Sequence, residues 1–369
     1  MRLSHHLPAA LLLVSILGCA TVEPAPAPSP ALVQLPSPTP DQTPNQTYYF
    51  PPSISPQAYA FLEKTLPIVA KAQAARPEAR TAADFEERRQ QLSAGAEART
   101  APVLKALGVS ASDAQMAGVG VVEIEPPQYQ DDGTVLLHVH GGGFVQDSAR
   151  TAVAGDALMA VKTGKRIISV DYTLAPEGKW PLVTDQVIGV YKALLAQGYP
   201  ARSIGMYGDS AGGNIVAASV LKLRDQGVEM PGALVLLSPG LDLTMSSDTW
   251  TTLHDADPVL NRDGELRLAF SLYADPADYK NPYASPIYGD FSKGYPPVLL
   301  QAGTKERVLS DSVRMYQELK AAGVESVLDI YEGMPHVFQA YLMGTPEQTA
   351  AYAQINKFWA EHLVPRKPG

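Results

Sequence analysis

The sequence predicts an α/β fold in which a mostly parallel central sheet is covered by helices on both faces. Short apolar runs rich in β-branched residues recur from about residue 117 onward, and most of them alternate with helical patterns. Strands that alternate with helices form parallel sheets buried on both faces, because each crossover helix lies over the sheet. The 46% hydrophobic content is that of a globular protein, and 369 residues suffice for a sizeable core.

Composition excludes several classes of protein. The chain has 29 Lys and Arg against 38 Asp and Glu, and this formal charge of −9 lacks the electrostatic footprint of a nucleic-acid binder. The single cysteine cannot form an internal disulfide or a thiolate metal site. His138 and His140 share a strand face without an evident third ligand, so we expect no metal and no cofactor.

The N-terminus predicts export and lipid attachment. Arg2, a short apolar stretch and small residues at its end form an export signal, and the stretch is too short to span a bilayer, which takes ~20 residues. Its ending, Ile-Leu-Gly-Cys, resembles the lipobox of bacterial lipoproteins. That resemblance implies a lipid anchor at Cys19 in the cell envelope, and Ala20 favours the outer membrane. The alternative is an ordinary signal peptide with an incidental cysteine.

The proline content predicts the next segment. Eleven of the 32 prolines fall within residues 24–56, and proline fixes φ and favours extended chain. We therefore assign residues 1–18 to a signal peptide and 19–54 to a proline-rich tether. Residues 55–116 are rich in helix formers, and we expect helices at 57–75 and 82–107 with no strand.

Residues 117–369 form the predicted α/β domain. Its strands are expected at 119–124, 134–139, 165–170, 203–207, 233–237, 297–300 and 327–331. The first two, joined across 131–133, are expected to make an antiparallel pair. Helical patterns lie at 152–162, 182–196, 211–226, 311–322 and 348–362. Residues 243–290 interrupt the alternation with one helical pattern and no strand, so we interpret them as an insertion.

A nucleophile is predicted at Ser210. The segment GDSAGG at 208–213 is a G-x-S-x-G motif between a strand pattern and a helical pattern, the context that the motif requires. The flanking glycines allow a sharp turn that lifts the serine hydroxyl to the sheet edge. The start of the following helix points toward any negative charge that forms nearby.

An oxyanion loop is predicted at 140–144, where HGGGF directly follows a strand pattern. Three glycines leave backbone N–H groups unshielded, and acyl transfer needs such donors where oxyanion charge develops. The alternative is a flexible or phosphate-binding loop. A phosphate loop would need Lys-Ser or Lys-Thr to follow, and residues 145–147 supply neither.

The remaining members of a triad should follow the serine in the order acid, then histidine. Of the seven histidines, His336 alone sits in a turn after the last strand pattern. Glu306 and Asp311 both follow the penultimate strand, and a carboxylate there would orient His336 and stabilise its protonated form. Aspartate suits the first turn of a helix, so we favour Glu306 as the acid, with Asp311 as the alternative.

Together these residues resemble the hormone-sensitive-lipase-like family of α/β-hydrolases, specifically its bacterial esterases with GDSAGG. The resemblance covers residues 117–362 and also includes the segments at 171–177, 257–260 and 284–286. It implies an α/β-hydrolase fold with a helical cap made by 55–115 and 243–290. Many relatives pair through the edge of the last strand, so a homodimer is a further expectation.

The family pattern also implies roles for individual residues. Ser210 corresponds to the nucleophile, His336 to the general base and Glu306 to the acid. The oxyanion donors correspond to the N–H groups of Gly142, Gly143 and Ala211. Relatives often have glycine where Asp147 stands, and a carboxylate aimed into the site would oppose oxyanion formation. We therefore expect Asp147 to point to solvent or to be paired.

The sequence thus predicts a serine carboxylester hydrolase for short- to medium-chain acyl esters. A carbohydrate (acetyl) esterase or amidase with the same triad is an alternative, since only the substrate would differ. A non-catalytic ligand receptor on the same fold is less consistent, because it would lack a triad member and His336 is present.

Overall fold

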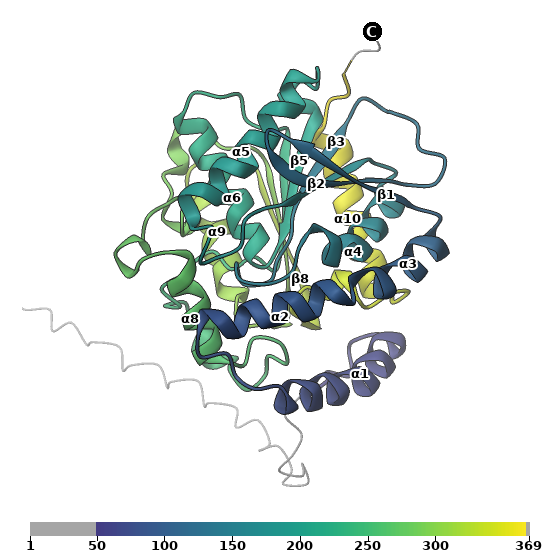
Figure 1. Cartoon of the computed structure of the whole chain (residues 1–369), viewed down its shortest axis with the longest axis vertical. Coiled ribbons are helices and arrows are strands. Elements are labelled where there is room, and N and C mark those ends of the chain that lie inside the picture. The colour runs from purple at the N-terminus through teal and green to yellow at the C-terminus, as the bar shows by residue number, and fades with distance from the viewer. Residues whose placement is uncertain (1–48, 367–369) are drawn as a thin grey trace, which may run out of the picture. The chain divides into compact units, whose positions relative to one another are not determined.

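The computed structural model describes residues 49–366, which contain an eight-stranded sheet in the order β1-β2-β4-β3-β5-β6-β7-β8 (Figure 1). The strands are β1 (Ser110–Met116), β2 (Val119–Glu125), β3 (Val135–Val139), β4 (Ile167–Asp171), β5 (Ile204–Asp209), β6 (Ala233–Leu237), β7 (Val298–Lys305) and β8 (Ser326–Pro335). Strands β3 to β8 are parallel, whereas β2 is antiparallel to both of its neighbours. The predicted mostly parallel sheet is confirmed.

Helices cover both faces of this sheet, as the sequence predicts. On one face α4 (Ala149–Thr163) and α10 (Pro346–His362) pack together; on the other lie α5 (Trp180–Ala196), α6 (Ala211–Asp225) and α9 (Leu309–Ala321) (Figure 1). Successive strand residues point to opposite faces, so Leu136 and Leu137 belong to two separate core clusters. Both clusters are apolar, which explains why the central strands read as continuous apolar runs.

The first strand corrects the expectation that residues 55–116 contain no strand. Residues 110–116 form β1, an edge strand paired with β2 through a turn at Ala117 and Gly118, whose φ angles are +52° and +78°. Two positive φ angles are the signature of a tight hairpin turn. The strand was missed because most of its side chains are exposed or half-buried, so it carries no apolar run.

The pairing of β2 also differs from the prediction. β2 was expected to pair with β3 across residues 131–133, but its partners are β1 and β4, and β3 lies one position further into the sheet. Strand order depends on long-range packing of the crossover helices, which local patterns do not encode.

The N-terminal helical pattern resolves into α1 (Pro56–Ala75), α2 (Ala82–Ala94) and α3 (Ala96–Leu107), so the predicted second helix is divided at Gly95. The insertion 243–290 holds α7 (Thr249–Thr252) and α8 (Asp263–Tyr273) and no strand, as predicted. A charged clamp joins these two distant segments. The Glu265 carboxylate on α8 accepts bonds from Arg88 at 2.6 and 3.0 Å and from Arg76 at 3.1 Å.

The predicted signal peptide, Cys19 and the tether up to residue 48 lie outside the described residues. Between residues 49 and 366, no helix is both long enough and apolar enough to cross a membrane.

Two glycine-to-alanine substitutions test the packing of the sheet against the helices. A Cβ at Gly205 on β5 would lie 2.7 Å from Leu136 Cδ2 and 2.9 Å from Trp359 Cζ3. Overpacking of this kind costs about 1–3 kcal/mol, so we expect Gly205→Ala to lower the free energy of unfolding by that amount.

Gly155→Ala is the matched control. Gly155 lies inside α4, where the nearest atom to an added Cβ is Ala340 Cβ at 4.0 Å. The higher helix propensity of alanine should raise the free energy of unfolding by about 0.5–1 kcal/mol. Denaturant unfolding of both variants measures the two effects, and a Gly205→Ala variant as stable as wild type would contradict the packing.

Candidate active site

Ser210 occupies a strained turn between β5 and α6. Its φ and ψ angles are +51° and −121°, a left-handed φ that is unfavourable for any residue with a side chain. The conformation of this turn is fixed because the start of α6 packs directly against the end of β3. A Cβ on Gly212 would overlap the carbonyl oxygens of Val139 and His140, so only glycine permits this approach.

The structure brings Ser210, His336 and Glu306 into one hydrogen-bonded row. Nε2 of His336 lies 2.9 Å from Ser210 Oγ, and its Nδ1 lies 2.8 Å from Glu306 Oε2. Glu306 is fully buried and His336 is 5% exposed, so their contact is shielded from water, whereas the contact with Ser210 lies at the cavity. This is the order of contacts that a nucleophile, a base and an orienting acid require.

Neighbouring strands bring the histidine and the acid together. Glu306 follows β7 and His336 follows β8, and these two strands are adjacent and parallel. The backbone N–H of Gly303 donates to Glu306 Oε1 at 2.6 Å, and the Tyr341 hydroxyl donates to the His336 carbonyl at 2.9 Å. Both residues are therefore held by contacts that involve the backbone of their own turns.

Burial and pairing act in opposite directions on this pair. Burial disfavours the imidazolium form of His336, but the hydrogen bond and charge of Glu306 outweigh it, so the pKa of His336 is raised. Burial also raises the pKa of Glu306, and the hydrogen bond from His336 only partly offsets that rise. The arrangement favours a histidine that accepts a proton readily.

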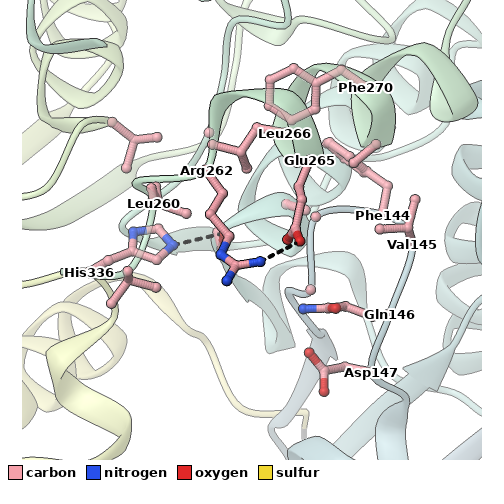
Figure 2. A pocket seen from close by; sticks show the side chains of 18 of the residues that line it. Phe144, Val145, Gln146, Asp147, Leu260, Arg262, Glu265, Leu266, Phe270 and His336 are labelled. Atoms are coloured by element: carbon pink, nitrogen blue, oxygen red, sulfur yellow. Dashed lines mark hydrogen bonds and ion pairs between the residues drawn. The ribbon is translucent and has the colours of Figure 1, made fainter. Parts of the chain in front are cut away.

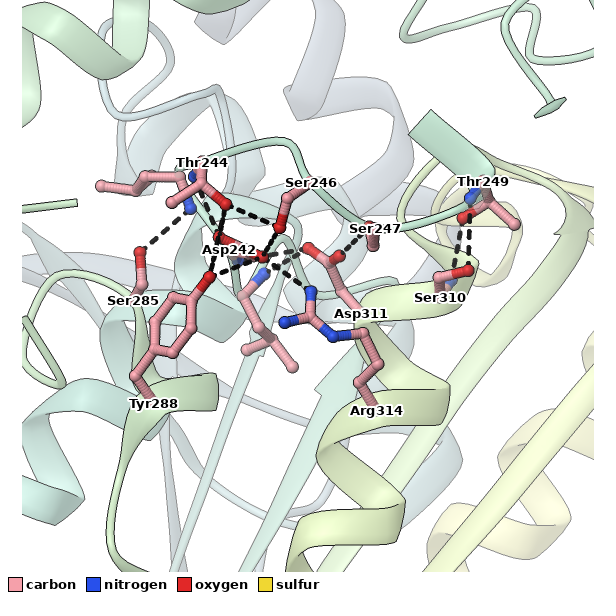
Figure 3. A network of polar contacts seen from close by, with 12 residues as sticks. Asp242, Thr244, Ser246, Ser247, Thr249, Ser285, Tyr288, Ser310, Asp311 and Arg314 are labelled. Carbon is pink, nitrogen blue, oxygen red and sulfur yellow. Dashed lines mark hydrogen bonds and ion pairs between the residues drawn. The ribbon is translucent and has the colours of Figure 1, made fainter. Parts of the chain in front are cut away.

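Asp311, the alternative acid, makes no hydrogen bond to His336 or Ser210, and Figure 3 shows the polar network to which it belongs instead. Its fully buried carboxylate accepts the N–H groups of Leu241 and Asp242 at 2.9 and 3.2 Å and the Ser247 hydroxyl at 2.6 Å. Burial raises its pKa to about 7. Asp311 lies in the first turn of α9, as expected, and holds the start of the insertion.

The glycine loop after β3 presents backbone donors beside Ser210. Gly142, Gly143 and Ala211 line the same cavity as the serine hydroxyl. Within residues 49–366, the N–H groups of Gly142 and Gly143 donate no hydrogen bond, and Ala211 is the first residue of α6, where an N–H has no helical partner. These donors are free to bind an anionic oxygen.

Two residues that the sequence reasoning did not single out hold this loop. Asp209 Oδ1 accepts the N–H of Gly141 at 3.2 Å. The Tyr172 hydroxyl donates to the carbonyls of His140 and Gly141 at 3.1 and 3.3 Å. Asp209 lies in the GDSAGG motif and Tyr172 lies in the segment at 171–177. Their contacts with the loop join neighbouring strands, so no local sequence pattern predicts them.

The cavity above Ser210 has a volume of about 300 Å³, and Figure 2 shows its lining. Phe144, Leu266 and Phe270 form an apolar wall, whereas Arg262 and Glu265 form a charged one. Arg262 donates to Glu265 at 2.8 Å. Burial opposes the charge of Glu265, but its bonds to the arginines and to a backbone N–H hold its pKa at about 2. Arg76 and Phe85 also line the cavity, so both segments predicted as the cap contribute to it.

Asp147 departs in part from the expectation that it points to solvent or is paired. It lines the cavity, and its only hydrogen bond within residues 49–366 comes from the Thr151 hydroxyl at 3.3 Å. Burial raises the pKa of Asp147 and so favours the neutral form of its carboxyl group beside the glycine loop.

No metal site accompanies these residues in the part of the chain that the structure describes. Between residues 49 and 366, no group of three or more His, Cys, Asp or Glu side chains is arranged to bind a metal ion. His140, one of the two histidines considered as ligands, stacks on Tyr172 and lies 2.8 Å from the Gly141 carbonyl through Nδ1.

Comparison with known proteins agrees with this geometry. A family model described as the alpha/beta hydrolase fold matches residues 136–340. An esterase of Acinetobacter venetianus is 37% identical over 246 residues, covering 66% of this chain and 80% of that protein. An acetyl-hydrolase of Streptomyces hygroscopicus is 31% identical over 252 residues, covering 68% and 83%.

Solved structures extend the likeness over more of the chain. An esterase aligns with a TM-score of 0.77 and 32% identity over 85% of this chain and 96% of its own. An esterase from the bacterial hormone-sensitive lipase family aligns with a TM-score of 0.73 and 32% identity over 84% and 99%. The chain therefore belongs to the α/β-hydrolase fold family, among the esterases related to hormone-sensitive lipase, and it is a hydrolase.

Proposed function

We propose that the protein is a serine carboxylester hydrolase for short- to medium-chain acyl esters, with Ser210, His336 and Glu306 as its triad. The observation that carries the proposal is the contact of His336 with Ser210 on one ring nitrogen and with Glu306 on the other. The esterase and acetyl-hydrolase relatives support ester hydrolysis as the reaction.

The proposed reaction follows from these contacts. His336 Nε2 takes the proton of Ser210 as Oγ attacks the ester carbonyl, and Glu306 stabilises the imidazolium that forms. The N–H groups of Gly142, Gly143 and Ala211 bind the oxyanion. His336 then protonates the leaving alcohol, and a water molecule activated by the same nitrogen hydrolyses the acyl-enzyme and restores Ser210.

Cavity size supports the proposed range of acyl chains. About 300 Å³ is at the lower end of the volumes that small-molecule sites usually have. Phe144 stacks on the buried Tyr273 with ring centroids 3.9 Å apart, so one wall of the cavity is rigid and apolar. A short or medium acyl chain fits such a wall better than a long one.

A second candidate is the removal of acetyl groups from a polar substrate. The Streptomyces hygroscopicus relative is an acetyl-hydrolase. The cavity is lined not only by the apolar Phe144 but also by the polar side chains of Arg262 and Gln146. Acetyl esters of sugars and p-nitrophenyl esters, assayed side by side, would separate the two candidates by their kcat/KM values.

The proposed location rests on the sequence of the N-terminus. A lipid at Cys19 and a proline-rich tether would hold the hydrolase domain at the surface of the outer membrane.

The first prediction concerns the nucleophile. Ser210→Ala should lower kcat for p-nitrophenyl butyrate by about 10⁵-fold or more, because no other group can form the acyl-enzyme. Ser271→Ala, which changes an exposed serine of α8, is the matched control and should keep full activity. Wild-type activity in Ser210→Ala would refute the proposal.

The second prediction concerns the acid and the pH dependence. The reaction needs neutral His336, so the acid limb of kcat/KM reports its pKa, which Glu306 raises. Glu306→Gln should cost about 10³-fold or more in kcat/KM and move that limb to lower pH, because the largest contribution that raises the pKa of His336 is then lost while burial still lowers it.

Asp311→Asn is the control for this charge. It removes a buried carboxylate that does not contact His336, so the acid limb should keep its position even if the variant is less stable. If Asp311→Asn moves the limb and Glu306→Gln does not, the two roles are reversed. The measurement is the pH profile of kcat/KM on folded protein.

The third prediction concerns the anchor. Cys19→Ser should abolish incorporation of a labelled fatty acid in cells and release the protein from the membrane fraction. Ester hydrolysis by the α/β domain should be unchanged, since Cys19 precedes that domain in the chain. Labelling that persists in the Cys19→Ser protein would show that the lipid lies elsewhere.

A further inference from the structure

A second buried histidine lies directly behind the glycine loop. His138 is on β3, two residues before His140, where the loop begins, and only 3% of it is exposed. Each of its ring nitrogens faces a carboxylate. Nδ1 lies 2.8 Å from Asp156 Oδ1 on α4, and Nε2 lies 3.2 Å from Asp209 Oδ1 at the end of β5.

This geometry favours a doubly protonated ring. A neutral imidazole carries one N–H, so it could donate to only one of the two carboxylates, and its other nitrogen would face a buried carboxylate with no proton between them. Burial opposes the charge of His138, but Asp156 and Asp209 outweigh it and raise its pKa to about 9. The ring is thus an imidazolium at neutral pH.

A hydrogen bond connects this group of charged side chains to the glycine loop. Oδ1 of Asp209, which faces His138, also accepts the N–H of Gly141. Gly141 is followed at once by Gly142 and Gly143, the proposed oxyanion donors. Burial acts to raise the pKa of Asp209, but the hydrogen bond and charge of His138 hold it below its ordinary value, so Asp209 stays charged and keeps its contact with the loop.

We propose that His138 is a positioning residue for the oxyanion loop, because its imidazolium joins Asp156 to Asp209 and Asp209 holds the backbone of Gly141. The inference rests on the proposed esterase function and deepens it. His138 acts through Asp209 and does not touch the reacting atoms.

Two other polar side chains contact His138, but only the two carboxylates carry a charge that can balance its imidazolium. Tyr207 of β5 stacks on the ring at 4.4 Å and donates to Asp156 at 2.6 Å. Ser169 of β4 lies 2.9 Å from Nδ1 but is neutral. Neither side chain therefore supplies a charge that could replace a carboxylate.

Titratable groups on the neighbouring elements do not compete with this charge. His140 is the nearest other basic side chain on the same strand, and burial lowers its pKa, so it adds no positive charge at neutral pH. Tyr352 of α10 lines the cavity of about 190 Å³ that borders His138, and burial raises the pKa of its hydroxyl, so it stays neutral.

The role predicts an alkaline limit to catalysis. As the pH rises through about 9, His138 loses a proton and with it the positive charge that balances Asp156 and Asp209. Asp209 then holds Gly141 less firmly, and the oxyanion donors lose their alignment. Because these donors act mainly in the transition state, kcat should fall while KM changes little.

His138→Gln tests the role in the mature protein with p-nitrophenyl butyrate. Glutamine keeps a hydrogen-bonding side chain but cannot carry the charge, so we expect kcat to fall about tenfold at pH 7.5 with KM nearly unchanged, and the alkaline limb near pH 9 to disappear. A phosphonate inactivator, whose adduct places an oxygen at the oxyanion site, should react more slowly by a similar factor. Ser169→Ala, the matched control, removes only the neutral partner and should keep both kcat and the limb.

The outcomes separate this inference from the proposed function. An inactive wild-type protein would overturn the esterase function itself. An active wild type with an unchanged His138→Gln variant, or with a loss of stability but the same kcat and alkaline limb, would overturn the role of His138. If His138→Gln does not fold, histidine ¹⁵N NMR of the wild type decides: two protonated ring nitrogens at pH 7.5, titrating together with kcat, support the role, and a neutral ring overturns it.

Discussion

The site depends on one backbone contact, the approach of Gly212 at the start of α6 to the carbonyls of Val139 and His140 at the end of β3. This contact places the Ser210 turn and the glycine loop against each other without any side chain between them. It also keeps Ser210 at a positive φ, a strain of about 1–3 kcal/mol that the surrounding sheet must sustain. Ser210 and the proposed oxyanion donors therefore have fixed positions before a substrate arrives, which is what the proposed oxyanion stabilisation requires.

Buried charge is the second constraint, and the domain meets it by pairing. Glu306 is balanced by His336 and by the N–H of Gly303, and Asp209 is balanced by His138 and by the N–H of Gly141. Removing one partner of a buried pair leaves an uncompensated charge, which costs far more than the pair contributes. These two charge pairs thus couple the proposed chemistry to pH. His336 sets its acid limit and His138 sets its alkaline limit.

The cavity owes its mixed lining to a clamp between segments far apart in the chain. Glu265 of α8 is bonded to Arg76 and Arg88, which precede it by 189 and 177 residues. With a pKa of about 2, Glu265 stays charged at any ordinary pH, so the clamp persists. The clamp places charged groups along one side of the cavity, whereas Phe144 and Phe270 form an apolar wall on the other side.

Local patterns in the chain were enough to predict the parallel sheet, the strand–turn–helix at Ser210 and the glycine loop, because these depend on apolar periodicity and on backbone freedom that single residues confer. They favoured Glu306 over Asp311 but could not decide, since both follow β7. The packing of β7 against β8 sets Glu306 2.8 Å from His336 and directs Asp311 to the insertion. The polar edge strand β1 and the contact of His138 with Asp209, 71 residues away, likewise arise from strand pairing, which joins residues that no local pattern connects.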